Sequence, residues 1–565
     1  MTMRLFPLWL QWIKLWNRSG MSGMLFGSIL IGILGGLGSA AFRQTEFEIR
    51  WLYSGTHDDI VTIAEHLSPW FRIGIPTLGG LVAGLFLWLS HQGGRAQDYL
   101  EVIRLGDGTL PVKSNLARLF SSITSIASGA SIGREGGMVQ LSALLASTFA
   151  RWVKPSITQR RLMIACGAAA GLSAAYNTPI SGALFIAEIV VGTLAIEVIG
   201  PLFIASLSAT VVMHHWIGLR PIFDLPDAAK DIDMDLDHVA LLGLVAGILA
   251  PALLVFLGAS RKLFFKLHLP TPLRIALGGL IVGIISVKVP EVWGNGHHVV
   301  EHILTESPAI DFVLIILAMK LLATGAAFGS GTVGGIFTPT LMFGACLGWL
   351  FGHLFNAPLT ADVAYATIGM GALLSGTTLA PLMAVLMVFE MTLDAKLIFP
   401  IAVACLIARY VASAIRPVSV YHTAIPAGQR KLPFHTHVEE IQKLNPKSYP
   451  LSGSLESTLG SGMRSSSLLL WITGSKGRFH GAARLEHLNR HALVGFEKKS
   501  IADFIEKDFP TLMESAPLTE ALTLMTKNRV DRLPVLNQDG MLVGEVLRRD
   551  LFLSLSFLHG PPWDY

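Results

Sequence analysis

The chain has 565 residues, of which 52% are hydrophobic and only 15% are charged. This composition excludes an ordinary soluble globular protein and indicates a chain that lies mostly in a membrane. The formal net charge of +4 is no indication of nucleic-acid binding in such a protein, and no nucleic-acid partner is expected.

Long uncharged stretches follow one another through the first 420 residues. A membrane-spanning helix needs about 20 residues, so each stretch predicts at least one such element and the longer ones predict two. Arg4, Lys14 and Arg18 precede the first stretch, with no acidic residue before Glu46, which favours a cytoplasmic N-terminus. The stretches are 24–42, 73–90, 162–187, 321–352 and 363–389.

An internal repeat organises this apolar part. SGASIGREGG at 128–137 is similar to SGTVGGIFTP at 330–339, and identical residues recur at a constant offset of 202. Eight matches without a gap indicate a duplicated unit, which is a common construction among membrane transport proteins. The first members of the eight pairs are Ser128, Gly129, Gly133, Gly167, Ser173, Pro179, Leu184 and Glu188.

Two adjacent charges, Arg134 and Glu135, interrupt the first copy between glycines. A helix that begins inside a membrane exposes unpaired N–H groups and the positive end of its dipole, and these can bind an anion. Binding by amides is weak enough for release, as conduction requires. The carboxylate of Glu135 is itself an anion that can occupy the same place, so we predict a gating role for Glu135. The alternative is that both charges cap a helix or pair elsewhere.

GREGG at 133–137, GIFTP at 335–339 and the isolated Tyr421 resemble the CLC family of chloride channels and chloride/proton exchangers. The resemblance runs in order over about residues 20–425. It implies an all-α polytopic membrane protein with two inverted halves, about 21–216 and 238–425. It also implies a homodimer in the cell (inner or plasma) membrane, with one anion pathway per subunit.

The resemblance assigns roles to residues of both repeat copies. Glu135 corresponds to the external gating glutamate of the family. The backbone amides of Ile336 and Phe337 correspond to the donors that hold the central chloride, and the hydroxyl of Tyr421 completes that site. The chloride-binding residues that the resemblance implies are Gly94, Gly133, Arg134, Gly136, Ile336, Phe337 and Tyr421.

Three departures from the family pattern bear on the mode of transport. GGRAQ at 93–97 replaces the usual GSGIP, which puts Gly94 where a serine hydroxyl faces the central anion, and Gly137 replaces a proline. Ile189 occupies the position of the inner proton-transfer glutamate, beside Glu188. Because isoleucine carries no proton, we expect passive or loosely coupled chloride conduction, with chloride/proton antiport as the alternative. The preferred anion stays open.

A charged tail follows a segment at 426–445 that is expected to be a linker. The last 145 residues hold 32 charged residues, whereas the first 420 hold 50. Residues 446–565 resemble a pair of CBS domains, a soluble α+β domain expected on the cytoplasmic side together with the N-terminal segment 1–20. In the second copy, 517–552, we expect a helix, a strand, a turn, a strand and a closing helix.

The first CBS copy, 450–491, is degenerate. CBS pairs of the family often bind adenine nucleotides through a hydroxyl and an aspartate. Asp550 matches the aspartate, whereas Leu547 stands at the hydroxyl position. A dimerising regulatory module is therefore the stronger prediction, and adenine nucleotide the weaker one.

The remote alternative is a membrane zinc metalloprotease. His298, Glu301 and His302 form the H-x-x-E-H pattern of some zinc proteases, with His297 beside them. A membrane metalloprotease explains neither the repeat nor Tyr421. The prediction is therefore a transport protein without catalytic residues, metal or required cofactor. Its expected partners are chloride, protons in the antiport alternative, the lipid bilayer and a second copy of the chain.

Overall fold

The computed structural model of the chain comprises a helical unit and a smaller, partly β-stranded unit, and each is described by itself. The helical unit contains most described residues up to Tyr421, and the smaller unit contains those from His437 onward. The structure describes residues 21–92, 98–104, 108–153, 155–218, 221–226, 235–306, 308–355, 359–419, 421, 437–440, 442–444, 446–452, 469–474, 477–484, 501–528, 530–548 and 551.

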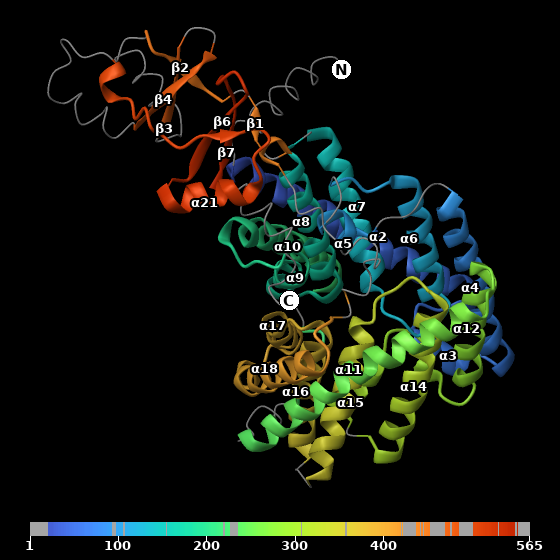
Figure 1. Ribbon diagram of the computed structural model, residues 1–565. Helices are drawn as coiled ribbons and strands as arrows, with labels where there is room; N and C mark the ends of the chain where they lie inside the picture. The colour runs from blue at the N-terminus through green and yellow to red at the C-terminus, as the bar shows by residue number, and fades with distance from the viewer. Residues whose placement is uncertain are drawn as a thin grey trace. The chain divides into compact units, whose positions relative to one another are not determined.

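The helical unit is shown in Figure 1. Six of its described helices are long and apolar enough to span a membrane. The first half contains α2 (Met21–Ser54), α3 (Ile60–His66), α4 (Pro69–Gln92), α5 (Tyr99–Arg104), α6 (Val112–Ala127), α7 (Glu135–Val153), α8 (Ile157–Tyr176), α9 (Pro179–Phe185), the π-helical η1 (Ile186–Val191) and α10 (Ile196–Ile217). The second half contains α11 (Leu236–Lys266), α12 (Thr271–Ser286), η3 (Pro290–Val292), α13 (His297–Thr305), α14 (Ile310–Ser330), α15 (Phe337–Leu354), α16 (Leu359–Thr378), α17 (Pro381–Thr392), η4 (Ala395–Leu397) and α18 (Ile398–Ile415).

The predicted repeat is confirmed by the helix boundaries. Helix α7 begins at Glu135 and α15 at Phe337, which are 202 residues apart. The same separation relates the starts of α4 and α12, α8 and α16, α9 and α17, and α10 and α18. It also relates the left-handed residues Asn177 (φ 54°) and Leu379 (φ 60°). The offset found in sequence is therefore an offset between equivalent structural elements.

The two halves exchange equivalent hydrogen bonds, in which a glutamate of one half caps a helix of the other. Glu188 accepts a hydrogen bond from the Met383 N–H at the start of α17 (3.0 Å). Glu390 accepts bonds from the Ile180 and Ser181 N–H groups at the start of α9 (2.8 Å each). Because a two-fold axis makes contacts reciprocal, these bonds indicate two halves related by a pseudo-two-fold axis. This is the geometry of inverted-topology repeats, and the predicted fold class is confirmed.

The halves differ at η1, which carries Glu188 and Ile189. In the first half, the left-handed Gly192 (φ 77°) lies thirteen positions after Pro179. In the second half, the left-handed Leu393 (φ 53°) lies only twelve positions after Pro381. A π-helical turn accommodates one extra residue, which explains the difference. The starts of α10 and α18 restore the common offset.

Glycines let α15 and α16 approach closely. A Cβ atom at Gly344 would lie 2.4 Å from the carbonyl oxygen of Gly369, and a Cβ atom at Gly369 would lie 2.3 Å from the oxygen of Gly344. Small residues at such crossings permit the backbone packing that holds membrane helices together. Helix α16 also contacts α11 and α18 (Figure 1).

The smaller unit repeats one arrangement of strands. Its first sheet has the order β2 (Ser448–Pro450), β3 (Leu469–Thr473) and β4 (Phe479–Arg484), and its second sheet β1 (Lys443–Leu444), β7 (Leu542–Leu547), β6 (Arg532–Leu536) and β5 (Leu512–Met513). In each sheet a short strand pairs in parallel with the first strand of an antiparallel hairpin. Both hairpins have a register shift, after Ile472 and after Val535. The duplication expected for this region is therefore present in the strand pairing.

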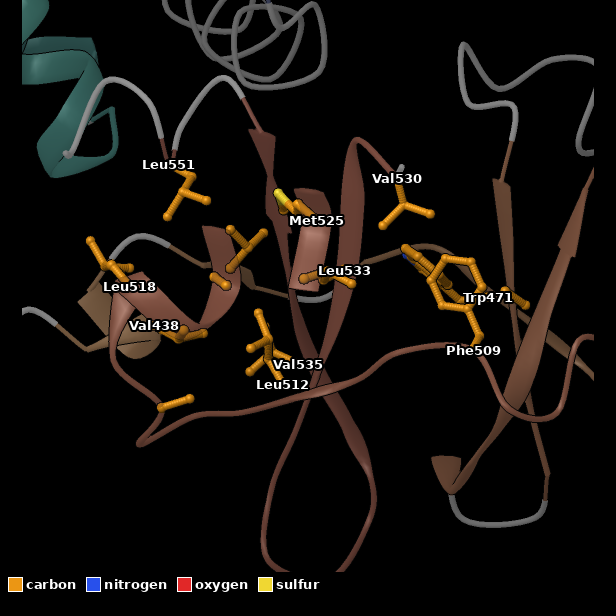
Figure 2. Close-up of a cluster of buried hydrophobic side chains, with 14 residues drawn as sticks. Val438, Trp471, Phe509, Leu512, Leu518, Met525, Val530, Leu533, Val535 and Leu551 are labelled. Carbon is orange, nitrogen blue, oxygen red and sulfur yellow. The ribbon is translucent and has the colours of Figure 1, made fainter. Parts of the chain in front are cut away.

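The core of the smaller unit gathers side chains from several of its elements. Helix α21 (Leu518–Asn528) supplies Met525, which is buried with Leu533 of β6 and with Trp471 of β3 (Figure 2). The Trp471 indole N–H donates to the buried Glu545 on β7 (3.0 Å), which links the two sheets. The helix, strand, turn and strand expected for the second copy are confirmed, whereas Asp550 lies outside the described residues.

We expect Gly344→Ala to destabilise the helical unit by about 1–3 kcal/mol, because the added methyl group must displace the backbone of α16. Thermal unfolding of the purified protein in detergent measures the effect. Gly258→Ala in α11 is the matched control, since a Cβ there meets nothing within 4 Å. Equal unfolding temperatures of the two variants would contradict the close approach.

Candidate functional site

Two helix N-termini meet where the two repeat copies touch. The loops before α7 and α15 pair through Gly133 and Gly335, whose N–H groups donate to each other's carbonyl oxygens (2.7 and 2.8 Å). A Cβ atom at Gly136 would lie 3.2 Å from the carbonyl carbon of Gly334, so the glycines allow this approach. The positive ends of two helix dipoles and their unpaired amides are thereby brought together.

The carboxylate of Glu135 occupies this meeting point. Its Oε1 accepts hydrogen bonds from the backbone N–H groups of Phe337 (3.0 Å) and Thr338 (3.4 Å). Its Oε2 accepts a bond from the Thr338 hydroxyl (3.3 Å). Only 4% of Glu135 is exposed. A negative group from the first half therefore caps a helix of the second half, at amides that suit an anion.

Two hydroxyl groups extend this contact. The Tyr176 hydroxyl lies 2.6 Å from the Thr338 hydroxyl oxygen. Because Thr338 donates its hydrogen to Glu135, the Tyr176 O–H donates to Thr338. Both residues are buried, and the Tyr176 ring packs on Phe337 with ring centroids 5.2 Å apart. No sequence motif predicted this chain of hydroxyls, although Thr338 stands within the GIFTP motif.

A cavity of about 570 Å³ adjoins the site, and we call it the tyrosine cavity. Tyr421, Ile336 and Gly136 all line it, so the structure brings together three residues that were predicted to bind chloride. Tyr421 packs edge-on against Phe185 at 5.1 Å. The tyrosine cavity is therefore the place where an anion can contact the Tyr421 side chain.

Two further cavities, of about 190 and 300 Å³, share Arg43, Arg134, Asn295 and His297 in their walls. We call them together the arginine cavity. Tyr176 and Thr338 also line it. Gly136, which follows Glu135 in the chain, lines the tyrosine cavity, whereas Arg134, which precedes it, lines the arginine cavity. Glu135 therefore stands between the two cavities.

Other predicted chloride-binding residues have different surroundings. The Gly133 N–H is occupied by Gly335, so Gly133 serves to join the two loops. The Arg134 side chain lies 4.0 Å from the Glu46 carboxylate and lines the arginine cavity instead of the tyrosine cavity. Gly94 lies outside the described residues.

The position that the resemblance assigns to an inner proton-transfer glutamate holds a buried isoleucine. Ile189 is 4% exposed within η1, and its neighbour Glu188 caps α17 through Met383. The Glu188 carboxylate therefore has a structural partner of its own.

The H-x-x-E-H residues lie on α13, where His302 pairs with Glu306 (3.1 Å) and His297 lines the arginine cavity. Among the described residues, no three His, Cys, Asp or Glu side chains are close enough to hold a metal ion together. The metalloprotease interpretation gains no support from this geometry.

Comparisons with known proteins identify the family. The family model for voltage gated chloride channels matches residues 78–413, and the CBS domain model matches residues 501–556. The chain is 43% identical to a putative chloride channel protein ClcB-like from Ralstonia nicotianae, over 70% of this chain and 95% of that protein. It is 39% identical to the voltage-gated ClC-type chloride channel ClcB of Salmonella dublin, over 69% of this chain and 96% of that protein.

The chain is also similar to solved structures of CLC proteins. A slow cyanobacterial Cl⁻/H⁺ antiporter matches with a TM-score of 0.63 and 25% identity, over 71% of this chain and 96% of that one. A eukaryotic CLC transporter shows the same fold with a TM-score of 0.60 and 17% identity, over 93% of this chain and 97% of that one. The chain therefore belongs to the voltage-gated chloride channel family, with a CBS domain in its smaller unit.

Proposed function

We propose that this protein transports chloride through a pathway gated by Glu135, in a passive or loosely coupled mode. The observation that carries the proposal is the Glu135 carboxylate on the amides of Phe337 and Thr338, between two cavities. The carboxylate competes with chloride for the same donors. When it leaves, those amides are free for an anion that enters from either cavity.

The chemistry of the donors suits transport rather than storage. Amide and hydroxyl groups stabilise an anion without a full positive charge, so the anion can leave again. Protonation of Glu135 removes the negative charge that its partners stabilise, and a neutral carboxyl holds the closed position less tightly. Acid on the side that protonates Glu135 is therefore expected to open the pathway.

The alternative is chloride/proton antiport. The buried Ile189 side chain favours weak coupling, because isoleucine cannot carry a proton. The Tyr176–Thr338 hydroxyl pair favours the alternative, since it offers a hydrogen-bonded route to Glu135. The similarity to a solved Cl⁻/H⁺ antiporter gives the alternative further support.

We also propose the arrangement typical of the family, a homodimer in the cell membrane with the N-terminus and CBS pair on the cytoplasmic side. Helices α10 and α18 present exposed apolar side chains, among them Ile196, Val211, Phe399 and Tyr410, that suit lipid or a second subunit. The CBS pair is proposed as a regulatory module without an enzymatic role.

Glu135→Gln is expected to abolish most of the pH dependence of chloride flux. In the parent protein flux should rise as the pH falls, because the protonated carboxyl releases the amides of α15. The amide of glutamine does not titrate in this range and leaves flux nearly constant. Chloride efflux from proteoliposomes at several pH values measures this, and a variant with the parental pH profile would refute the gate.

Tyr176→Phe is expected to raise flux about 2–5-fold at pH values where the gate is mostly closed. The variant loses one hydrogen bond in the chain that holds the carboxylate, a loss of roughly 0.5–1 kcal/mol. Tyr365→Phe is the matched control, because its hydroxyl faces His238 at 3.5 Å and the residue lines neither cavity. Equal flux in both variants would show that the hydroxyl pair does not hold the gate.

The coupling mode is tested by the reversal potential of chloride flux under an imposed pH gradient. Passive conduction keeps the reversal potential at the chloride equilibrium value. We expect at most a small displacement, because Ile189 cannot relay protons. A large displacement that follows the proton gradient would reject conduction and establish the antiport alternative.

A further inference from the structure

The charges that face the arginine cavity do not balance. Its walls contain Arg43, Arg50 and Arg134 and the acids Glu46 and Asp59. Glu46 is shared by two of the arginines, since it lies 3.6 Å from Arg50 and 4.0 Å from Arg134. Three basic residues thus face two acidic ones.

Both acids already have partners. Asp59 caps helix α3 by accepting a hydrogen bond from the Val61 N–H (3.1 Å), and Glu46 faces Arg50 and Arg134. The Arg43 side chain forms no hydrogen bond or ion pair with any residue that the structure describes. Arg43 is therefore the one of these three arginines whose guanidinium has no acid in direct contact, and it shares the attraction of Glu46 with Arg50 and Arg134.

Arg43 stands in α2, one of the helices apolar enough to span the membrane. A half-buried guanidinium without an acidic partner is costly unless another polar group satisfies it. An ionisable residue in such a helix is a functional candidate by default. The cavity at its side leaves room for a small ligand and water, about 190 Å³ in the part that also contains Tyr176 and Thr338.

The other walls add donors of the same kind. Asn295 has a side-chain amide, and its carbonyl oxygen accepts from the His297 N–H (3.2 Å), which leaves the NH₂ group as a donor. The His297 ring packs on Phe223 at 4.9 Å and supplies a ring N–H in either tautomer. Donors and positive charge together select a small monovalent anion.

We propose that the arginine cavity is a second anion site, where chloride binds beside Arg43, Arg134 and His297 next to the gate. The inference rests on the proposed function, and it adds a place where the anion waits outside the Glu135 position. Thr338 connects the two, because it lines the cavity and its N–H and hydroxyl hold Glu135. An anion in the cavity is therefore positioned to reach the α15 amides when the carboxylate leaves.

The direct test uses bromide as the probe and crystals of the full chain. An anomalous peak in the arginine cavity is expected in the parent protein and in Arg43→Lys, and it should be lost in Arg43→Gln. Asn295→Asp is a second variant that keeps the acceptor for His297 and adds a negative charge, so it should also lose the peak. Absence of the peak from the parent protein, or its persistence in both charge-altering variants, would overturn the proposal.

The functional readout separates this site from the gate. Arg43→Gln should raise the half-saturating chloride concentration about 3–10-fold for chloride offered on the Arg43 side, with little change at saturating chloride. Unchanged half-saturation would overturn the waiting role. If the parent protein moves no chloride but still shows the bromide peak, the proposed function fails while the anion site stands.

Discussion

The whole helical unit depends on one constraint, that backbone amides opened inside a membrane must be satisfied without bulk water. The chain starts α7 and α15 in its interior, next to each other, and each start leaves N–H groups without intrahelical partners. Glu135 satisfies those of α15 from the opposite half. The same solution recurs at α9 and α17, where Glu390 and Glu188 exchange caps between the halves. Carboxylates of each half thus cap helix N-termini of the other half.

The difference between Glu135 and Glu390 explains why the first carboxylate suits the proposed gating role and the second a structural one. Glu390 receives two backbone bonds and the Ser181 hydroxyl, so its carboxylate is fully engaged. Glu135 receives one bond of 3.0 Å and two longer ones, and its neighbours in the chain, Arg134 and Gly136, line different cavities. A carboxylate with weaker bonds and space beside it can leave at low cost, whereas one with short bonds cannot.

The features that could be predicted from the sequence are those that short runs of adjacent residues determine. The 202-residue repeat, Glu135 and the amides of α15 follow from two short motifs. The sequence did not predict Tyr176 or Arg43 as neighbours of the Glu135 site, because these residues are far from both motifs in the sequence and reach the cavity beside the site only through the fold. Thr338 stands within the GIFTP motif, but the pattern alone did not single out its hydroxyl. The predicted stretches also left out α10 and α11, although 198–219 and 238–260 contain no Asp, Glu, Lys or Arg and Glu197 and Asp237 lie only in the first turns of these helices. The extra π-helical residue in η1 left the offset unchanged on both sides, so sequence matching passed over it.

Among the residues that the structure describes, the Glu135 carboxylate is bonded by neutral donors and by no guanidinium. The amides of Phe337 and Thr338 and the hydroxyls of Thr338 and Tyr176 surround the Glu135 carboxylate, whereas Arg43 lines only the arginine cavity. A guanidinium in place of the α15 amides would bind an anion or the Glu135 carboxylate too tightly to release either. Under the proposed function, the same charge placed one cavity away raises the local anion concentration without trapping the anion at Glu135. In this proposal, attraction of the anion depends on Arg43 and its release depends on Glu135 and the α15 amides. Either group can then vary without abolishing the role of the other.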